Sequence, residues 1–448
     1  MRGTHILTDK THDKAQLEVF QSLPVLRANT LHLVEKPLEG FMGFGVAITG
    51  ASCYQLSLMA EKERTVLLQQ VYGKDGLNLS VARLSIGASD YSANVYSYDD
   101  VEDDVELKHF SIAPDMEYIV PMIKEVLKVR PDLYLFASPW SPPGWMKTGG
   151  DMCGGHMRAC YVECYAEYII KFLKAYAAEG IHIRCITPQN EPNTHQRSFM
   201  PACLWHPEIE PEYIRVLRKK LKENGMDVKI WMYDHDFADH NRVLWMLKNL
   251  DGLKENVDGA AFHYYSGTIE ETLKVRRAYS DVPLHFTEAG PRLYDHYGDD
   301  WCKWGIMITK AFKCGYSSFT GWNLMLNELG GPNVGPHPCG GLVTRNSVTG
   351  ELSFSGQYKA LDHIAKYINE KTKIYPLYVG EEYDLPMSKY PAMPRDIEGF
   401  ALDNDDGKYV LVLINPNDSK TQTQIQLNGV WWYIELSPES ISTITVNA

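Results

Sequence analysis

Eight short apolar runs, each followed by a longer amphipathic stretch, constrain the fold of this chain most strongly. Nearly continuous apolar strands are typical of a parallel sheet covered on both faces. Eight strand and helix alternations over roughly 250 residues or more fit a TIM barrel better than an open doubly wound sheet. We therefore predict a (β/α)8 barrel. The runs are GVAITG, LSVARLSIG, LYLFASPW, IRCITPQN, VKIWMYDHD, GAAFHYYS, PLHFTEAG and SSFTGWNL.

The stretches between the runs have the periodicity of amphipathic helices. No Gly-x-Gly-x-x-Gly motif follows the first runs, which argues against a dinucleotide-binding fold. The helices expected from this pattern are 61–73, 116–129, 161–176, 211–223 and 354–368.

Both ends of the chain differ from this central region. Beyond about residue 370 the sequence changes to short alternating strands separated by turn residues, which is typical of an antiparallel β-sandwich. The N-terminal segment FQSLPVLRANTLHLVEK also has the pattern of strands. We expect residues 39–370 to form the barrel, and residues 1–38 to join residues 371–448 in one sandwich domain.

Composition and charge exclude several classes of function. A chain of 448 residues with 44% hydrophobic and 23% charged residues is an ordinary soluble globular protein. Its formal charge of -13, with no basic run longer than Arg218 to Lys220, argues against nucleic-acid binding and for a neutral substrate. The first residues lack the apolar core of a secretory signal, and no window has the roughly 18 apolar residues of a membrane span. We therefore expect a cytoplasmic protein, and a homo-oligomer stays open.

The nine cysteines are odd in number and lie in core-like segments, so we expect reduced thiols rather than a disulfide framework. One group, Cys153, His156, Cys160 and Cys164, lies within twelve positions and has the residue types of a zinc site. Because no Cys-x-x-Cys pair is present, we interpret it as a loop leading into a helix with buried thiols. We expect no metal and no cofactor.

Two glutamates end strand-like runs and carry the chemistry. Glu191 follows ITPQN and Glu288 ends PLHFTE. An ionisable side chain at the end of a buried strand costs free energy unless it is paired or used. A carboxylic acid that gives a proton and a carboxylate that attacks carbon are the pair that a retaining glycosidase needs.

Polar and aromatic side chains stand at the ends of the other runs, where a TIM barrel places its active site. Aromatic faces suit the C–H surface of a sugar, and polar groups suit its hydroxyls. Taken singly, the tryptophans would more often be core residues and the arginine part of a structural ion pair, but together they favour a sugar pocket. The candidates are Arg83, Asp90, Trp140, Asn190, His263, Tyr265, Trp322 and Asn323.

Several blocks of the sequence resemble glycoside hydrolase family 30, the family of lysosomal glucosylceramidase. In chain order they are GFGVAITGASCYQLS, ARLSIGASDYSANVYSYDD, FASPWSPPGWMKTGG, ITPQNEPN, HFTEAG and GWNLMLNELGGPN. The resemblance extends from about Gly40 to Tyr367, and a terminal sandwich is also a feature of the family. The loop THQRSFMPACLWHPEIEP and the cysteine-rich loop before it depart from the glucosylceramidase pattern. We expect these two loops to border the leaving group, whose identity stays open.

The resemblance implies a role for each matching residue. It implies that Glu191 is the acid/base, Glu288 the nucleophile and Asn190 a donor to the sugar 2-hydroxyl. It further implies that Asp90, Trp140 and Trp322 form the walls of the glycone subsite, with Asn323 beside them. His263, Tyr265 and Arg83 match residues near the nucleophile.

These roles require different proton affinities in the two glutamates. We expect Arg83 and the Tyr265 hydroxyl to hold the pKa of Glu288 down. We expect the facing carboxylate and an apolar pocket to raise the pKa of Glu191. Pro192 favours an extended backbone at Glu191.

The sequence therefore predicts a retaining, exo-acting β-glycosidase that cleaves terminal β-glucosides by way of a covalent glycosyl-enzyme. The substrate is a small-molecule, oligosaccharide or glycolipid β-glycoside. A β-xylosidase, β-fucosidase or β-1,6-glucanase of the same family is the alternative. A carbohydrate-binding protein without catalysis and a metal-dependent hydrolase are more remote hypotheses.

Overall fold

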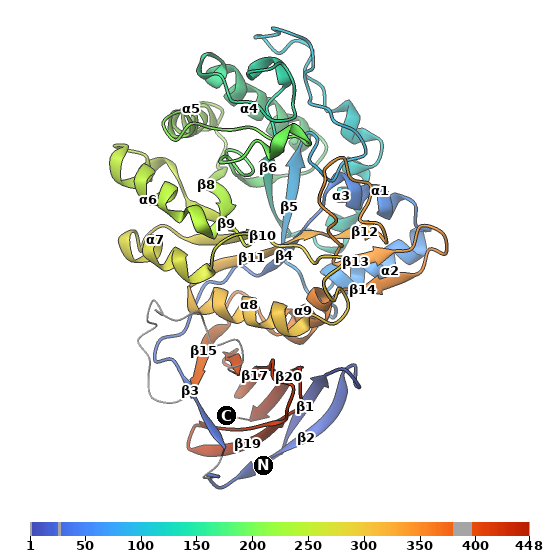
Figure 1. Cartoon of the computed structure of the whole chain (residues 1–448), viewed down its shortest axis with the longest axis vertical. Coiled ribbons are helices and arrows are strands. Elements are labelled where there is room, and N and C mark those ends of the chain that lie inside the picture. Colours follow the sequence, from blue (N-terminus) through green and yellow to red (C-terminus); the bar gives the residue numbers. More distant parts are fainter. Residues whose placement is uncertain (1, 26–27, 380–396, 448) are drawn as a thin grey trace.

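The computed structural model of the chain describes residues 2–25, 28–379 and 397–447. It contains an eight-stranded parallel barrel and a second domain rich in antiparallel sheet, which lie one above the other in Figure 1. The predicted fold class is thus confirmed. Residues 380–396 of the predicted C-terminal region lie outside the described residues.

Each of the eight predicted runs contains one strand of the barrel. The strands follow one another around the barrel in chain order, and β11 closes it by pairing in parallel with β4. Their bounds are β4 Phe44–Ala47, β5 Val81–Ile86, β6 Tyr134–Pro139, β7 Ile183–Ile186, β8 Lys229–Asp236, β9 Gly259–His263, β10 Leu284–Glu288 and β11 Tyr316–Asn323.

Two layers of inward-facing side chains fill the barrel. The lower layer is apolar and contains Val81, Phe136, Cys185, Trp231 and Ala261, one from each of five neighbouring strands. Side chains on one face of a strand recur every second residue. The next layer towards the carboxyl ends is therefore formed by residues two positions further on, and these are polar: Arg83, Ser138, Thr187, His263 and, from β10, Thr287.

The five helices expected from the sequence are present, and the chain forms further helices that the pattern did not indicate. The helix α1 is buried along most of its length and has no polar face, and α8 is buried between the barrel and the second domain. The helices are α1 Gly50–Ser57, α2 Glu61–Tyr72, α3 Ile119–Val129, α4 Val162–Ala178, α5 Ile209–Glu223, α6 His240–Asn249, α7 Leu273–Ala278, α8 Trp301–Lys313 and α9 Gly356–Ile364. No helix among the described residues is long and apolar enough to cross a membrane.

The second domain combines strands from both ends of the chain, as the sequence suggested. Its ladder runs β1-β2-β19-β18-β3-β15-β16-β17-β20 and closes through the pairing of β1 with β20. The pairing of β18 with β3 is parallel, whereas its other pairings are antiparallel. The strands are β1 Arg2–Thr8, β2 Ala15–Ser22, β3 Asn29–Leu33, β15 Lys373–Val379, β16 Glu398–Asp403, β17 Lys408–Asn415, β18 Thr421–Leu427, β19 Val430–Leu436 and β20 Ser440–Asn447.

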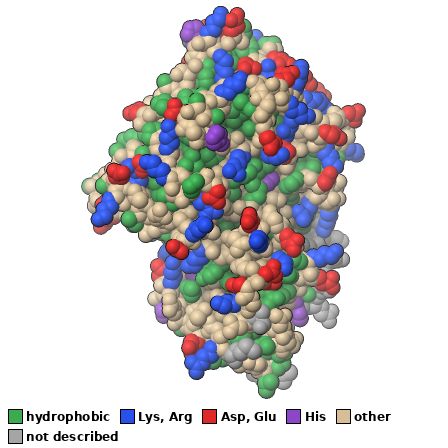
Figure 2. Space-filling view, turned by 180° about the vertical axis from the view of Figure 1, so that it is seen from behind, with side chains coloured by type: hydrophobic (Ala, Val, Ile, Leu, Met, Phe, Trp, Pro, Cys, Tyr) green, Lys and Arg blue, Asp and Glu red, His purple; other side chains and the backbone are tan. Residues whose placement is uncertain are grey.

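A small three-stranded sheet stands beside the mouth of the barrel. It is formed by β12 Met325–Asn327, β13 Val343–Arg345 and β14 Leu352–Phe354. On the face shown in Figure 2, acidic and basic side chains are interspersed. This distribution agrees with the absence of a nucleic-acid footprint in the sequence.

The two domains meet along α8 and α9. At Gly305 on α8 an added Cβ would lie 2.7 Å from Ile414 Cγ1, so the helix approaches β17 more closely than other residue types would allow. On α9, His363 Nδ1 lies 2.8 Å from Thr443 Oγ1, and its Nε2 lies 2.8 Å from Thr8 Oγ1. Both ring nitrogens therefore bond uncharged hydroxyls inside the junction.

Burial lowers the pKa of His363 to about 3, below its value of about 6.5 in an unfolded chain. The neutral ring stabilises the fold fully above pH 6.5, and this contribution is lost as the pH falls from 6.5 towards 3, because the unfolded state then binds the extra proton. Between pH 6.5 and pH 5, we expect the contribution of His363 to the free energy of unfolding to fall by about 2 kcal/mol. Chemical denaturation of His363→Gln should show a shallower loss over that interval. The exposed His206→Gln should retain the steeper loss, and equal slopes in all three proteins would refute this account.

Candidate active site

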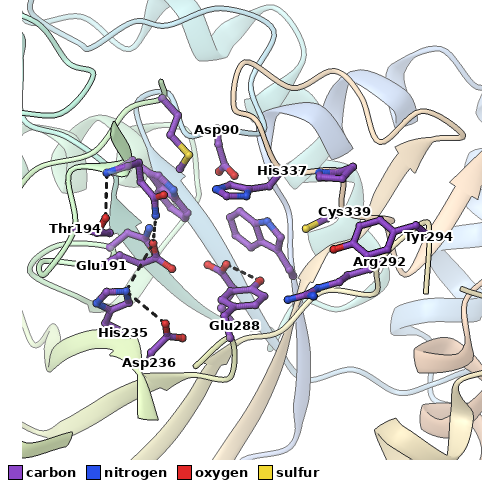
Figure 3. Close-up of a pocket in the computed structure, with 17 residues that line it drawn as sticks. Asp90, Glu191, Thr194, His235, Asp236, Glu288, Arg292, Tyr294, His337 and Cys339 are labelled. Atoms are coloured by element: carbon purple, nitrogen blue, oxygen red, sulfur yellow. Dashed lines mark hydrogen bonds and ion pairs between the residues drawn. The ribbon is translucent and has the colours of Figure 1, made fainter. Parts of the chain in front are cut away.

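A pocket of about 430 Å³ opens at the carboxyl ends of the barrel strands (Figure 3). Seven of the ten residues that the sequence singled out line it: Asp90, Trp140, Asn190, Glu191, Tyr265, Glu288 and Trp322. Arg83 and His263 lie directly behind this lining and bond to it. Asn323 is not in the lining, because its Oδ1 turns inward to accept from Thr49 Oγ1 at 2.7 Å.

The two glutamates face each other across His263. One oxygen of Glu191, one oxygen of Glu288 and one ring nitrogen of His263 all lie within 4.8 Å of one another. His263 Nδ1 is 3.3 Å from Glu191 Oε1 and 4.0 Å from Glu288 Oε2. Glu288 also accepts from the Tyr265 hydroxyl at 2.8 Å.

The backbone at Glu191 differs from the expectation that Pro192 would keep it extended. Its φ is 53°, which is in the left-handed region that non-glycine residues seldom adopt. The Glu191 N–H donates to the Asp234 carbonyl at 3.0 Å, and the Glu191 carbonyl accepts from Thr194 N at 3.2 Å. The tertiary bond to Asp234 and the turn bond from Thr194 together outweigh the local preference, and strain of this kind is common at functional sites.

Arg83 links several side chains at the bottom of the pocket. Its guanidinium is fully buried and donates to Glu288 Oε2, to Asn190 Oδ1 at 2.7 Å and to Asp234 Oδ2 at 2.8 Å. Its Cζ lies 4.8 Å from the ring centroid of Trp140 and 5.3 Å from that of Trp322. One cation thus orients the candidate nucleophile, the candidate sugar donor and both tryptophans.

Asp234 is the central acceptor of the site, and the sequence reasoning missed it. Its two oxygens accept from five side chains of the polar barrel layer: Arg83 at 2.8 Å, Ser138 at 2.9 Å, Thr187 at 2.6 Å, Thr287 at 2.7 Å and His263 at 3.0 Å. These contacts make it the anchor of both Arg83 and His263.

A bulge in β8 explains why Asp234 was missed. Strict alternation from the inward-facing Trp231 would turn Tyr233 inward rather than Asp234. The register shifts between Tyr233 and His235, and both Tyr233 and Asp234 have positive φ, at 77° and 68°. A bulge re-aims side chains in this way, commonly next to active sites. The Asp-His-Asp ending of the fifth run was the available signal.

This geometry is that of a known family. Residues 41–368 match the family described as the Glycosyl hydrolase family 30 TIM-barrel domain. The chain belongs to glycosyl hydrolase family 30. The resemblance found in the sequence is therefore confirmed, and the protein is a glycosidase by family.

Named relatives of this family 30 member differ in substrate. It is 28% identical over 406 residues to the lysosomal acid glucosylceramidase of Mus musculus, covering 85% of this chain and 76% of the relative. It is 28% identical over 349 residues to an endo-1,6-beta-D-glucanase of Neurospora crassa, covering 73% and 70%. Among solved structures, SrfJ from Salmonella typhimurium superposes with a TM-score of 0.89 at 26% identity and covers 100% of both chains.

The proton affinities of the two glutamates are opposite to the expectation. Burial raises the pKa of Glu288, although His263, Arg83 and Tyr265 oppose the rise. Burial also acts to raise the pKa of Glu191, but the charges of His235 and His263 and hydrogen bonds from His263 and Gln196 lower it to about 2. The sequence did not indicate that His235 and Gln196 would lie next to Glu191, because one comes from the bulged β8 strand and the other from a loop.

Asp90 has the features of a ligand-binding acceptor. Burial, followed by the charges of Glu288 and Glu191, raises the pKa of Asp90 well above its usual value. Its Oδ1 is buried and has no hydrogen-bond partner among the described residues. A buried polar atom aimed into a pocket without a partner is commonly one that a ligand satisfies.

The remaining pocket residues form its outer part. Thr194, Gln196 and Met200 belong to the loop after β7, which the sequence analysis expected to border the leaving group. His235 and Asp236 end β8. The others, which the sequence analysis did not assign, come from loops after β10 and β12: Arg292, Tyr294, His337, Pro338 and Cys339.

The thiols of the cysteine group are less buried than expected, because Cys153 and Cys164 are only partly buried. Cys153 and His156 lie on isolated bridges to Pro201 and Leu204, Cys160 is exposed, and Cys164 donates to the Val105 carbonyl. Within residues 2–25, 28–379 and 397–447, the cluster with converging ligand atoms is Glu191, His263 and Glu288. In that cluster Arg83 already donates to Glu288, which disfavours a cation there.

We predict that Asp234→Asn lowers kcat/KM for an aryl β-glucoside on the order of 100-fold or more, because Arg83 and His263 lose their common anchor. The melting temperature should also fall, since the change leaves part of a buried charge pair uncompensated. Steady-state kinetics and thermal unfolding measure both effects. Asp227→Asn, at an exposed position just before the same strand, is the matched control. Wild-type kcat/KM in Asp234→Asn would contradict this role.

Proposed function

We propose that the protein is a retaining, exo-acting β-glycosidase that releases terminal β-glucosyl units, with Glu288 as nucleophile and Glu191 as acid/base. The observation that carries the proposal is the approach of the two carboxylates, whose oxygens come within 4.8 Å. Retaining enzymes hold their carboxyl groups about 5 to 5.5 Å apart, whereas inverting enzymes leave about 6.5 to 9.5 Å for a water molecule.

The reaction proceeds in two displacements. Glu288 attacks the anomeric carbon while Glu191 protonates the departing oxygen, and a covalent glycosyl-enzyme forms. Glu191, now a carboxylate, takes a proton from water, which attacks the same carbon and releases the sugar with retained configuration. Arg83 and Tyr265 bind the ionised form of Glu288, the form that attacks in the first step and leaves in the second.

The glycone end of the pocket supports binding of one sugar unit. Asn190 Oδ1 accepts from Arg83, so the amide nitrogen is the group available to a sugar 2-hydroxyl. Asp90 offers its unpartnered Oδ1. The segment that carries Gly335 closes over this end, since Val334 N donates to the Asp90 carbonyl at 2.8 Å. A closed end favours removal of terminal units over cleavage within a chain.

An endo-acting β-1,6-glucanase is the second candidate. The observation in its favour is the name of the Neurospora crassa relative, together with polar side chains around the outer pocket such as Gln196, Asp236 and Arg292. A β-xylosidase or β-fucosidase would use the same catalytic pair.

The roles of the two glutamates can be separated by the leaving group. Glu288→Gln should abolish turnover of every substrate. Glu191→Ala should lose about 10²–10⁴-fold on glycosides with basic leaving oxygens. It should still release dinitrophenol in a burst from its β-glucoside, then stall, and azide should restore turnover and give the β-glucosyl azide. Product analysis by NMR distinguishes the anomers. Formation of the β-azide by Glu288→Gln, with Glu191→Ala inert, would reverse the two assignments.

The mode of attack can be read from early products. On a linear β-1,6-glucan we expect glucose alone at low conversion, because the closed glycone end accepts a chain terminus. Chromatography of the first products tests the mode of attack. Turnover of dinitrophenyl β-glucoside compared with dinitrophenyl β-xyloside tests the sugar preference. A ladder of longer oligosaccharides at early times would instead support the endo-acting candidate.

A further inference from the structure

Both oxygens of Glu191 are occupied by hydrogen-bond donors. Oε1 faces His263 Nδ1 at 3.3 Å, and Oε2 accepts from Gln196 Nε2 at 2.5 Å. Figure 3 shows the Glu191 carboxyl group with the labelled His235 beside it. Two donors on a carboxyl group favour its ionised form, yet the proposed first step needs a proton on it.

The nearest proton is on His263. The ring is fully buried, and its Nε2 lies 3.0 Å from Asp234 Oδ1. Asp234 already accepts four other bonds and is held ionised, with its pKa strongly lowered by Arg83 and His263, so Nε2 is the donor of that pair. Nδ1 can then donate to Glu191 only when the ring is a doubly protonated imidazolium. The surrounding carboxylates, Glu288 first and then Asp234, outweigh burial and raise the pKa of His263 to about 10.

We propose that His263 stores the proton that Glu191 delivers to the leaving group, and that Gln196 keeps Glu191 ionised until a substrate displaces it. His263 is thus a positioning and proton-supplying residue that acts through Glu191. The proposal rests on the proposed function, because it assumes that Glu191 is the acid.

The transfer costs no net charge. Three carboxylates, those of Glu191, Asp234 and Glu288, surround two cations, Arg83 and the His263 imidazolium. Moving one proton from His263 to Glu191 converts an ion pair into a neutral pair and leaves the net charge of the site unchanged. Because the net charge is the same in both states, a change in the hydrogen-bond partners of Glu191 can shift the balance between them.

Gln196 is the partner that a substrate can replace. The Gln196 amide gives a donor to Glu191 Oε2, whereas the oxygen of a glycosidic bond is only an acceptor. An acceptor at that position disfavours the bare carboxylate and favours an O–H on Glu191.

The loop that carries Gln196 is held in an unusual conformation. Gln196, Arg197 and Ser198 have consecutive positive φ values of 49°, 50° and 59°, which cost free energy for non-glycine residues. The turn packs on Gly154, where an added Cβ would lie 2.3 Å from Ser198 Oγ. Tertiary contacts thus place the Gln196 amide on the acid/base.

The proton balance closes over one turnover. The Nδ1–H bond of His263 breaks and an O–H bond forms on Glu191, while the second proton stays on His263 Nε2 and remains hydrogen-bonded to Asp234. Rotation of the carboxyl group presents this O–H to the leaving oxygen, which takes the proton as Glu288 forms its bond to carbon. In the second step Glu191 takes a proton from the attacking water, and this proton returns to His263 when Gln196 re-forms its bond.

Other titratable groups near the ring set the background of any pH profile. Three of these groups face the same space: His235 and Asp236 on β8, and Tyr265 after β9. The ring centroid of His263 lies 6.2 Å from that of His235 and 6.3 Å from that of Tyr265. His235 Nε2 lies 3.9 Å from Glu191 Oε2, beyond hydrogen-bond distance. His235 therefore acts on Glu191 through its charge rather than through a hydrogen bond.

The kinetic test compares His263→Gln with His206→Gln across pH 5 to 9. With phenyl β-glucoside, whose leaving oxygen needs protonation, His263→Gln should be within about 10-fold of wild type at pH 5 and reduced on the order of 100-fold at pH 8, because Glu191 alone loses its proton at lower pH. The alkaline limb of kcat/KM should thus move down by at least about one pH unit. The exposed His206→Gln, outside the pocket, should leave the limb in place. A loss by the same factor at every pH in His263→Gln would overturn the proposal.

Dinitrophenyl 2-deoxy-2-fluoro-β-glucoside separates this proposal from the proposed function. Its leaving group needs no acid, so it should label Glu288 at comparable rates in wild type and His263→Gln. Absence of labelling in wild type would defeat the proposed function itself. Labelling in wild type with a severe loss in His263→Gln would place the effect of His263 at the nucleophile and overturn the proton-store role alone.

A measurement on the wild-type protein needs no folded variant at position 263. With ¹³C-labelled histidine, the His263 ring should give imidazolium shifts at pH 8 in the free enzyme, because its pKa is raised to about 10. In Gln196→Met, which lacks the donor, the ring should titrate at lower pH, since Glu191 then competes for the proton. A neutral His263 ring at pH 8 in the wild type, or an unchanged titration in Gln196→Met, would overturn the proposal.

Discussion

The buried cluster of Arg83, Asp234, His263 and Glu288 is the interaction on which the rest of this structure depends. Burying charges is costly unless they are paired and hydrogen-bonded. Here the barrel supplies the partners, since four strands and the residue that follows β7 each contribute one side chain to Asp234. Closing the barrel is therefore also what assembles the site. The cost of the cluster is offset by the apolar layer beneath it, where Trp231 stacks on His285 with ring centroids 3.6 Å apart.

The cluster determines how the catalytic side chains are oriented more than it determines which substrate is bound. Arg83 aligns Glu288 and Asn190, and Asp234 aligns Arg83 and the His263 ring. The residues around the leaving group come from loops instead, and loops vary in length without disturbing the barrel. One relative is named a glucosylceramidase and another an endo-1,6-beta-D-glucanase. These different names are compatible with one shared buried cluster and with different loops around the leaving group.

The second domain contributes to the barrel through two helices and not through the pocket. Gly305 and His363 lie on the faces of α8 and α9 that meet β17 and β20. Strands from both ends of the chain close this domain, so the barrel segment is joined at its beginning and its end to the same folding unit. This arrangement explains why α8 is buried on two sides and leaves a narrow stripe of Lys303, Lys310 and Lys313 partly exposed.

The sequence by itself determined the eight strands, the composite second domain and the two glutamates. Apolar runs and strand-end residues are local patterns, and in a parallel barrel they fix which residues form strands and which lie at the carboxyl ends. It also indicated Arg83 and His263, which alternate in phase with Val81 and Ala261. Only the tertiary structure decided the role of Asp234, because a bulge in β8 breaks the alternation, and the left-handed backbone of Glu191, because bonds to Asp234 and Thr194 override Pro192. The order of the two glutamate pKa values was likewise decided there, since Gln196 and His235 reach Glu191 from segments whose approach no local pattern encodes.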